Sequence, residues 1–122
     1  MVQRIAKKKL IDLASKFKAV AVIGARQSGK TTLIKQVFKN KPYVSMENPD
    51  TRQFAIEDPR GFLSSFPKGA ILDEVQRVPQ LFSYLQEILD DQRAKGLFIL
   101  SGSNNFFTAE LGLKFNVMQL EE

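Results

Sequence analysis

Apolar and polar residues follow two alternating periodicities along the chain, which predict strands and helices in turn. Continuous apolar runs predict buried strands, of the kind found in parallel sheets, at residues 19–23, 70–72 and 97–100. Two further strands are predicted at residues 42–46 and 115–120. Helical spacing predicts helices at residues 2–18, 29–38 and 59–66 and from Pro79 onward, with a turn or helix opening at residues 48–50. This alternation predicts an α/β domain built on a parallel sheet.

Each helix has an apolar side that we expect to face the sheet. In the first helix this side is Ile5, Leu10, Leu13, Ala14 and Phe17. In the next helix it is Leu33, Ile34, Val37 and Phe38, and in the helix after Pro79 it is Leu81, Leu85, Ile88 and Leu89. We expect Gly96 to end that last helix.

The segment between the first predicted strand and the next helix has the pattern G-x-x-x-x-G-K-[ST], with Gly24, Gly29, Lys30 and Thr31 at its fixed positions. Converging backbone N–H groups and a helix N-terminus form a cradle for phosphate oxygens. Lys30 is expected to reach the β- and γ-phosphates and the Thr31 hydroxyl to ligate Mg²⁺. The expected nucleotide-binding residues are Gly24, Ala25, Arg26, Gln27, Ser28, Gly29, Lys30, Thr31 and Thr32.

Two adjacent carboxylates, Asp73 and Glu74, end the strand predicted at residues 70–72. Ligands of open α/β sheets bind at the carboxyl ends of the strands, so we expect this pair beside the glycine-containing loop. Asp73 is expected to hold Mg²⁺ together with Thr31, and Glu74 to polarise an attacking water as the catalytic base, with Lys30 at the phosphates.

Small polar residues follow the strand predicted at residues 97–100. Ser103 or Asn104 is expected to hydrogen-bond the γ-phosphate or the attacking water. An ordinary Ser/Gly/Asn turn explains the same residues.

The composition limits the possible functions. At 122 residues, with 43% apolar and 25% charged residues, the chain is expected to form one globular domain. No apolar stretch is long enough to span a membrane and no signal peptide is apparent. The absence of cysteine excludes disulfides and thiolate metal sites, and fits a cytoplasmic location. The absence of histidine leaves a carboxylate or a lysine as the general base.

The net charge of +5 resides entirely in residues 1–18, which hold six basic side chains and one acidic one. One interpretation is contact with nucleic acid or an acidic protein through Lys7, Lys8 and Lys9. The other is the solvated face of an amphipathic helix.

Four segments taken together resemble the prokaryotic AAA-superfamily ATPases that usually carry a C-terminal domain of unknown function. They are residues 24–32 (GARQSGKTT), 57–63 (EDPRGFL), 71–79 (ILDEVQRVP) and 100–104 (LSGSN). The resemblance implies a P-loop NTPase fold of three αβα layers, with a five-stranded sheet in the order 5-1-4-3-2. It also implies ATP binding, hydrolysis and oligomer formation, a sensor role near Ser103 and Asn104, and roles beyond packing for Gln76 and Arg77.

The chain departs from this pattern after Phe107. Residues 109–114 stand where such proteins typically carry a longer segment with an arginine, and the large C-terminal region is absent. We therefore expect a basic N-terminal helix at residues 1–18 and a shortened ATPase core at 19–122. An arginine finger contributes about 10³–10⁵-fold in rate, so hydrolysis without one is expected to be slow.

Three functions remain open at this point. The leading one is an ATPase that uses Mg²⁺. A P-loop kinase is the less favoured enzyme, because the Asp73–Glu74 pair suits activation of water. The third is a nucleotide-dependent module that binds DNA or a protein through residues 1–18 with little turnover.

Overall fold

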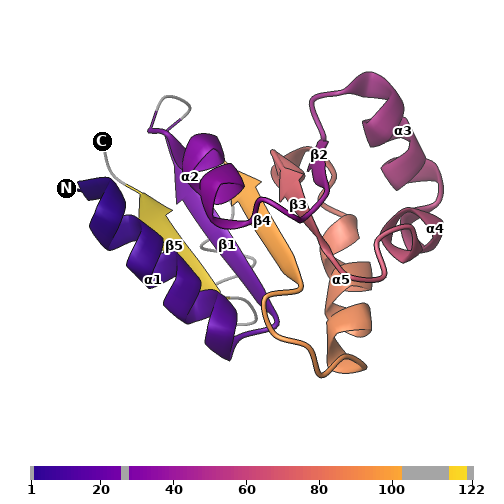
Figure 1. The fold of residues 1–122 in the computed structure, drawn as a ribbon. Coiled ribbons are helices and arrows are strands. Elements are labelled where there is room, and N and C mark those ends of the chain that lie inside the picture. Colours follow the sequence, from indigo (N-terminus) through magenta and orange to yellow (C-terminus); the bar gives the residue numbers. More distant parts are fainter. Residues whose placement is uncertain (1, 26–27, 103–115, 121–122) are drawn as a thin grey trace.

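Five parallel strands form one sheet in the order β2-β3-β4-β1-β5 (Figure 1). The computed structural model describes residues 2–25, 28–102 and 116–120. The strands are β1 (Ala19–Gly24), β2 (Tyr43–Ser45), β3 (Ala70–Asp73), β4 (Phe98–Gly102) and β5 (Asn116–Leu120). Read from the other edge, this is the order 5-1-4-3-2 that the family resemblance implies, so the predicted α/β fold is confirmed.

The helices lie close to their predicted positions. They are α1 (Val2–Lys16), α2 (Lys30–Val37), α3 (Pro49–Glu57), α4 (Pro59–Ser64) and α5 (Leu81–Asp90), and a 3₁₀ turn, η1, spans Val75–Arg77. The Asn48 side chain caps α3 by accepting from the N–H groups of Asp50 and Thr51. Asp58 caps α4 in the same way through the N–H of Gly61. Each cap is followed by a proline at the first helical position, which the sequence at 48–50 and 58–59 already indicates.

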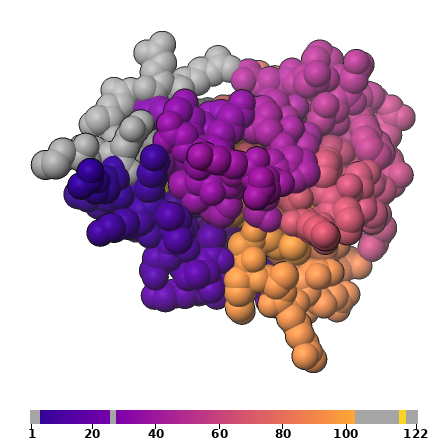
Figure 2. Space-filling model, viewed as in Figure 1, coloured from indigo at the N-terminus to yellow at the C-terminus, as the bar shows by residue number. Residues whose placement is uncertain are grey.

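Helices α1 and α2 pack side by side on one face of the sheet. Leu10, Leu33 and Ile34 from these helices form a buried cluster with strand residues such as Val20 and Ile99. In Figure 2 the indigo α1 and the purple α2 cover most of this face.

Helices α3, α4 and α5 pack on the opposite face and around the β2 edge. The buried cluster there includes Phe62, Leu85 and Leu100. Alternate residues of each strand point to opposite faces, so Ile99 belongs to one cluster and Leu100 to the other. The result is a three-layer αβα arrangement in which each central strand is buried on both sides.

The inward side of α1 differs from the predicted one. Ala6, Leu10 and Ala14 are buried, with Leu13 packed against them, whereas Ile5 is 70% exposed and Phe17 is 37% exposed. The buried side of α1 runs along Ala6, Leu10 and Ala14, so Ile5, one position before Ala6, lies outside it. The prediction that Ile5 and Phe17 face the core is therefore wrong.

Gly96 does not end α5, which stops at Asp90. Gly96 instead adopts φ 61° in the connection to β4, where a Cβ would lie 2.9 Å from the carbonyl oxygen of Ala14. A glycine is required here because the chain passes close to α1 in a left-handed conformation. The prediction of a C-terminal stop at Gly96 is wrong for this reason.

None of the helices among the described residues has the length and apolar character needed to cross a lipid bilayer.

We predict that Leu10→Ala and Ile5→Ala will have very different effects on the free energy of unfolding. Leu10 is fully buried, so its truncation leaves a cavity and is expected to cost roughly 2–5 kcal/mol. Ile5→Ala is expected to change stability by less than about 0.5 kcal/mol. Urea unfolding of the two variants measures both values. Equal losses would contradict the observed packing of α1.

Candidate functional site

The candidate site lies where the C-terminal ends of β1, β3 and β4 meet. The loop after Gly24 leaves β1, Asp73 ends β3, and Ser101 lies near the end of β4. These strands are neighbours or next neighbours in a parallel sheet, so their carboxyl ends share one edge. Ligands of open α/β sheets bind at this edge.

The loop from β1 turns sharply into α2. Ser28 donates to the carbonyl oxygen of Ala25 through both its backbone N–H (3.0 Å) and its hydroxyl (2.7 Å). Gly29 then adopts φ 86°, a left-handed conformation that favours glycine. The N-cap residue Gly29 supplies no side-chain acceptor to the first N–H groups of α2, which an anion could therefore bind.

The Lys30 side chain is buried at the start of α2, with 2% of the residue exposed. Its Nζ lies 3.5 Å from the carbonyl oxygen of Ala25 and 3.7 Å from Oε2 of Glu74. Both distances are long for charge-assisted hydrogen bonds, which normally measure about 2.7–2.9 Å. The buried ammonium group therefore retains capacity for a closer anionic partner.

Three hydroxyl groups surround the carboxylate of Asp73, which is also buried. Tyr43 donates to Oδ2 and Ser101 donates to Oδ1. The Thr31 hydroxyl lies 3.4 Å from Oδ2. These donors replace water around a charge that would otherwise be costly to bury.

Tyr43 belongs to the exposed edge strand β2 and reaches across to Asp73. Burial, followed by the hydrogen bond to Asp73, raises the pKa of the Tyr43 phenol, so it remains a proton donor. The Nζ atom of Lys35 lies 3.9 Å from the centre of the Tyr43 ring, a cation–π contact that holds the ring from α2.

Glu74 is the only non-glycine residue with a positive φ among the described parts of the chain, with φ 53° and ψ 43°. This left-handed residue separates β3 from η1. Its carboxylate is held between Lys30 and Gln76, whose Nε2 donates to Oε1 at 2.7 Å. Left-handed backbone at a non-glycine residue costs about 1–3 kcal/mol and is concentrated at functional sites.

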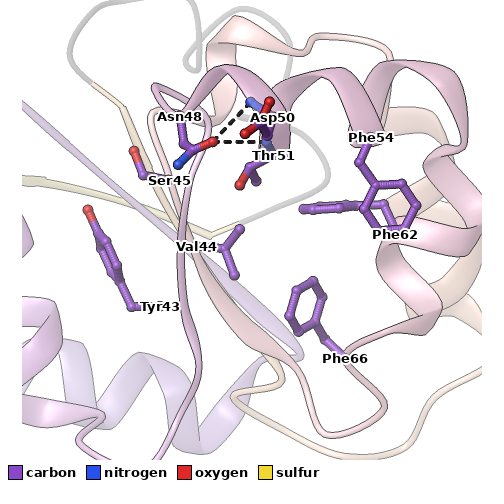
Figure 3. Close-up of a pocket in the computed structure, with 9 residues that line it drawn as sticks. All are labelled: Tyr43, Val44, Ser45, Asn48, Asp50, Thr51, Phe54, Phe62 and Phe66. Atoms are coloured by element: carbon purple, nitrogen blue, oxygen red, sulfur yellow. Dashed lines mark hydrogen bonds between the residues drawn. The ribbon is translucent and has the colours of Figure 1, made fainter.

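A pocket of about 600 Å³ adjoins this site on the outer side of β2 (Figure 3). Phe54, Phe62 and Phe66 form its apolar wall, with edge-to-face ring contacts between successive pairs. Tyr43 lines the opposite side and is thus shared between the pocket and the hydroxyl shell of Asp73.

The structure brings together most of the predicted site residues. Gly29, Lys30, Thr31, Asp73 and Glu74 converge, and Gly24, Ala25 and Ser28 form the described part of the loop. Thr32 is exposed on the first turn of α2. Arg26, Gln27, Ser103 and Asn104 lie outside the described residues, and their roles stay predictions.

Sequence reasoning missed the two strongest partners of Asp73, Tyr43 and Ser101. Ser101 follows directly after the apolar run at residues 97–100, so its place near the end of β4, the neighbour of β3, could have been predicted. Tyr43 has no such signal, because its role depends on the pairing of β2 with β3.

No cluster of three potential metal-ligating side chains (His, Cys, Asp or Glu) occurs within residues 2–25, 28–102 and 116–120. A divalent ion beside Thr31 and Asp73 would therefore need further oxygen ligands from phosphate and water. Mg²⁺ bound with nucleotides characteristically has such a mixed ligand set.

We predict that Ser101→Ala lowers the free energy of unfolding by roughly 1–3 kcal/mol, because it leaves a buried carboxylate oxygen of Asp73 without its donor. Ser64→Ala, at an exposed position on α4, is the matched control and is expected to have little effect. Urea unfolding in metal-free buffer measures both changes. Similar stabilities for the two variants would show that the Ser101 hydroxyl contributes nothing to Asp73.

Comparison with known proteins gives three findings. A family model described as an AAA domain matches residues 16–114. The uncharacterized proteins Mb2031c of Mycobacterium bovis and Rv2008c of Mycobacterium tuberculosis are each 38% identical over 87 residues, which is 69% of this chain and 19% of theirs. The chain thus spans about a fifth of their length. A solved structure of a DNA replication initiation factor aligns with a TM-score of 0.57 and 17% identity, over 97% of this chain and 44% of that one, a likeness of fold.

Proposed function

The chain belongs to the AAA domain family of ATPase-type nucleotide-binding modules, and from that premise we propose that it binds ATP with Mg²⁺ and hydrolyses it. The proposal places the triphosphate at the loop between β1 and α2. It assigns Lys30 to the phosphates, Thr31 and Asp73 to the metal ion, and Glu74 to the attacking water.

The observation that carries this proposal is the convergence of four side chains from two distant segments. Thr31 Oγ1 lies 3.4 Å from Asp73 Oδ2, and Lys30 Nζ lies 3.7 Å from Glu74 Oε2. A cation, a hydroxyl and two carboxylates thus meet beside the N-terminus of α2, whose N-cap residue is the glycine Gly29. A phosphate bound there would be stabilised by Lys30 and the helix N-terminus, while a bound Mg²⁺ would offset the charge of the two carboxylates.

The residues beside α2 suit a magnesium ion. The Thr31 hydroxyl and the Asp73 carboxylate are hard oxygen donors, which Mg²⁺ prefers. Two further hydroxyls, from Tyr43 and Ser101, orient the same carboxylate. When bound, the ion would neutralise charge on the phosphate oxygens.

Glu74 is the proposed general base in a chain that contains no histidine. Its carboxylate takes a proton from water as the water oxygen bonds to the γ-phosphorus. The bond from the γ-phosphorus to the β–γ bridging oxygen breaks, and its electron pair remains on the ADP product. Lys30 stabilises the negative charge of the phosphates during this step.

We predict that Lys30→Ala weakens the binding of Mg-ATP by about 100-fold or more, because the substitution removes the buried cation from the phosphates. Isothermal titration calorimetry measures the affinity. Lys39→Ala, at an exposed position just after α2, is the control and is expected to bind normally. Unchanged affinity in folded Lys30→Ala protein would contradict the nucleotide site.

We predict that Glu74→Gln retains the affinity for Mg-ATP and lowers kcat by about 10²–10⁴-fold, since an amide cannot accept the proton of the attacking water. Phosphate release under saturating Mg-ATP measures kcat, and calorimetry measures the affinity. Unchanged kcat would remove Glu74 from the role of base, whereas loss of binding would assign it to the phosphate site.

A further inference from the structure

Among the described residues, Gln76 makes the closer of the two polar contacts of the Glu74 carboxylate. Its Nε2 donates to Oε1 of Glu74 at 2.7 Å, while Lys30 Nζ lies 3.7 Å from Oε2. Glu74 is only 6% exposed, so bulk water solvates its carboxylate poorly. Among the described residues, the orientation of this carboxylate therefore depends on one amide and one ammonium group.

The backbone between the two residues makes this contact local. Glu74 is left-handed, and η1 follows at once, with Arg77 N–H donating to the Glu74 carbonyl oxygen at 3.1 Å. The turn folds the side chain at position 76 back over the one at position 74. Because the bond closes over two residues, holding it costs little additional chain entropy.

The amide oxygen of Gln76, Oε1, is buried and lacks a hydrogen-bond partner among the described residues. Rotating the amide by 180° would pair two acceptors, the Gln76 oxygen and a Glu74 oxygen, so the carboxylate fixes the orientation of the amide. A buried acceptor without a partner is unfavourable for stability.

We propose that Gln76 is a positioning residue for Glu74, whose carboxylate it holds at the site when Lys30 turns to the phosphates of a bound nucleotide. Lys30 is the only cation within 4 Å of Glu74 among the described residues, and phosphate is a competing partner for it. Once Lys30 is engaged there, the Gln76 amide is the donor that remains on Glu74 within the part of the chain that the structure describes. This inference rests on the proposed hydrolysis of ATP and adds the residue that orients its base.

The experiment compares Gln76→Met with Gln86→Met in steady-state hydrolysis of Mg-ATP. Gln86 is the matched control, because it is also partly buried, donates to a carboxylate (Asp90, 3.1 Å) and has a buried Oε1 without a partner among the described residues. Gln76→Met is expected to lower kcat by about 10–100-fold with KM changed less than about 2-fold, because a donor to a charged group is lost. Gln86→Met is expected to change neither. If Gln76→Met does not fold, Gln76→Asn, which keeps the amide and shortens its reach, replaces it with the same expectation.

A double-mutant cycle with Glu74→Gln separates positioning from a general structural effect. If Gln76 acts through Glu74, adding Gln76→Met to Glu74→Gln changes the residual kcat by less than about 2-fold. Equal losses in both backgrounds, or a parallel change in KM, would overturn the inference. If the wild-type protein hydrolyses ATP, and Glu74→Gln lowers kcat but Gln76→Met does not, only this inference is refuted. Binding of Mg-ATP without wild-type turnover would refute the proposed hydrolysis, and the inference with it.

Discussion

Three buried charges, on Lys30, Asp73 and Glu74, impose the main constraint on this fold. Burying a charge is costly unless other groups replace its water, so each must have partners brought from elsewhere in the chain. The sheet order supplies them: β4 lies between β1 and β3 and places Ser101 against Asp73. Strand β2, on the other side of β3, brings Tyr43 to the same carboxylate. The strand order of the sheet thus determines which hydroxyl groups stabilise the buried carboxylate of Asp73.

Features encoded within one segment could be predicted from the sequence. The apolar runs that become β1, β3 and β4 are buried on both faces, which makes them continuous and easy to detect. The turn at Gly29 and the following Lys30 and Thr31 are adjacent in sequence, so their pattern identified the loop directly. The strand order came from the resemblance to a family instead, because pairing between distant strands leaves no mark in local periodicity.

Several features that depend on contacts between segments could not be predicted, although the meeting of Thr31 and Asp73 at the sheet edge was. The outward position of Ile5 follows from the packing of Ala6, Leu10 and Ala14 against the sheet and α2, which helical spacing alone does not specify. Gly96 is needed for its contact with Ala14 and was mistaken for a helix end. Tyr43 became a partner of Asp73 only through the register of β2 on β3. In each case the deciding neighbour lies many residues away.

The long contacts of Lys30 support the proposed phosphate site. A purely structural buried pair requires close hydrogen bonds to offset desolvation, as Asp73 has with its hydroxyls. Lys30 instead lies 3.5 Å from one oxygen and 3.7 Å from another, at the N-terminus of α2. A phosphate oxygen at this position would accept from both the ammonium and the helix. The left-handed backbone of Glu74 also supports a functional site at the end of β3. This conformation costs free energy and persists only where the surrounding contacts enforce it.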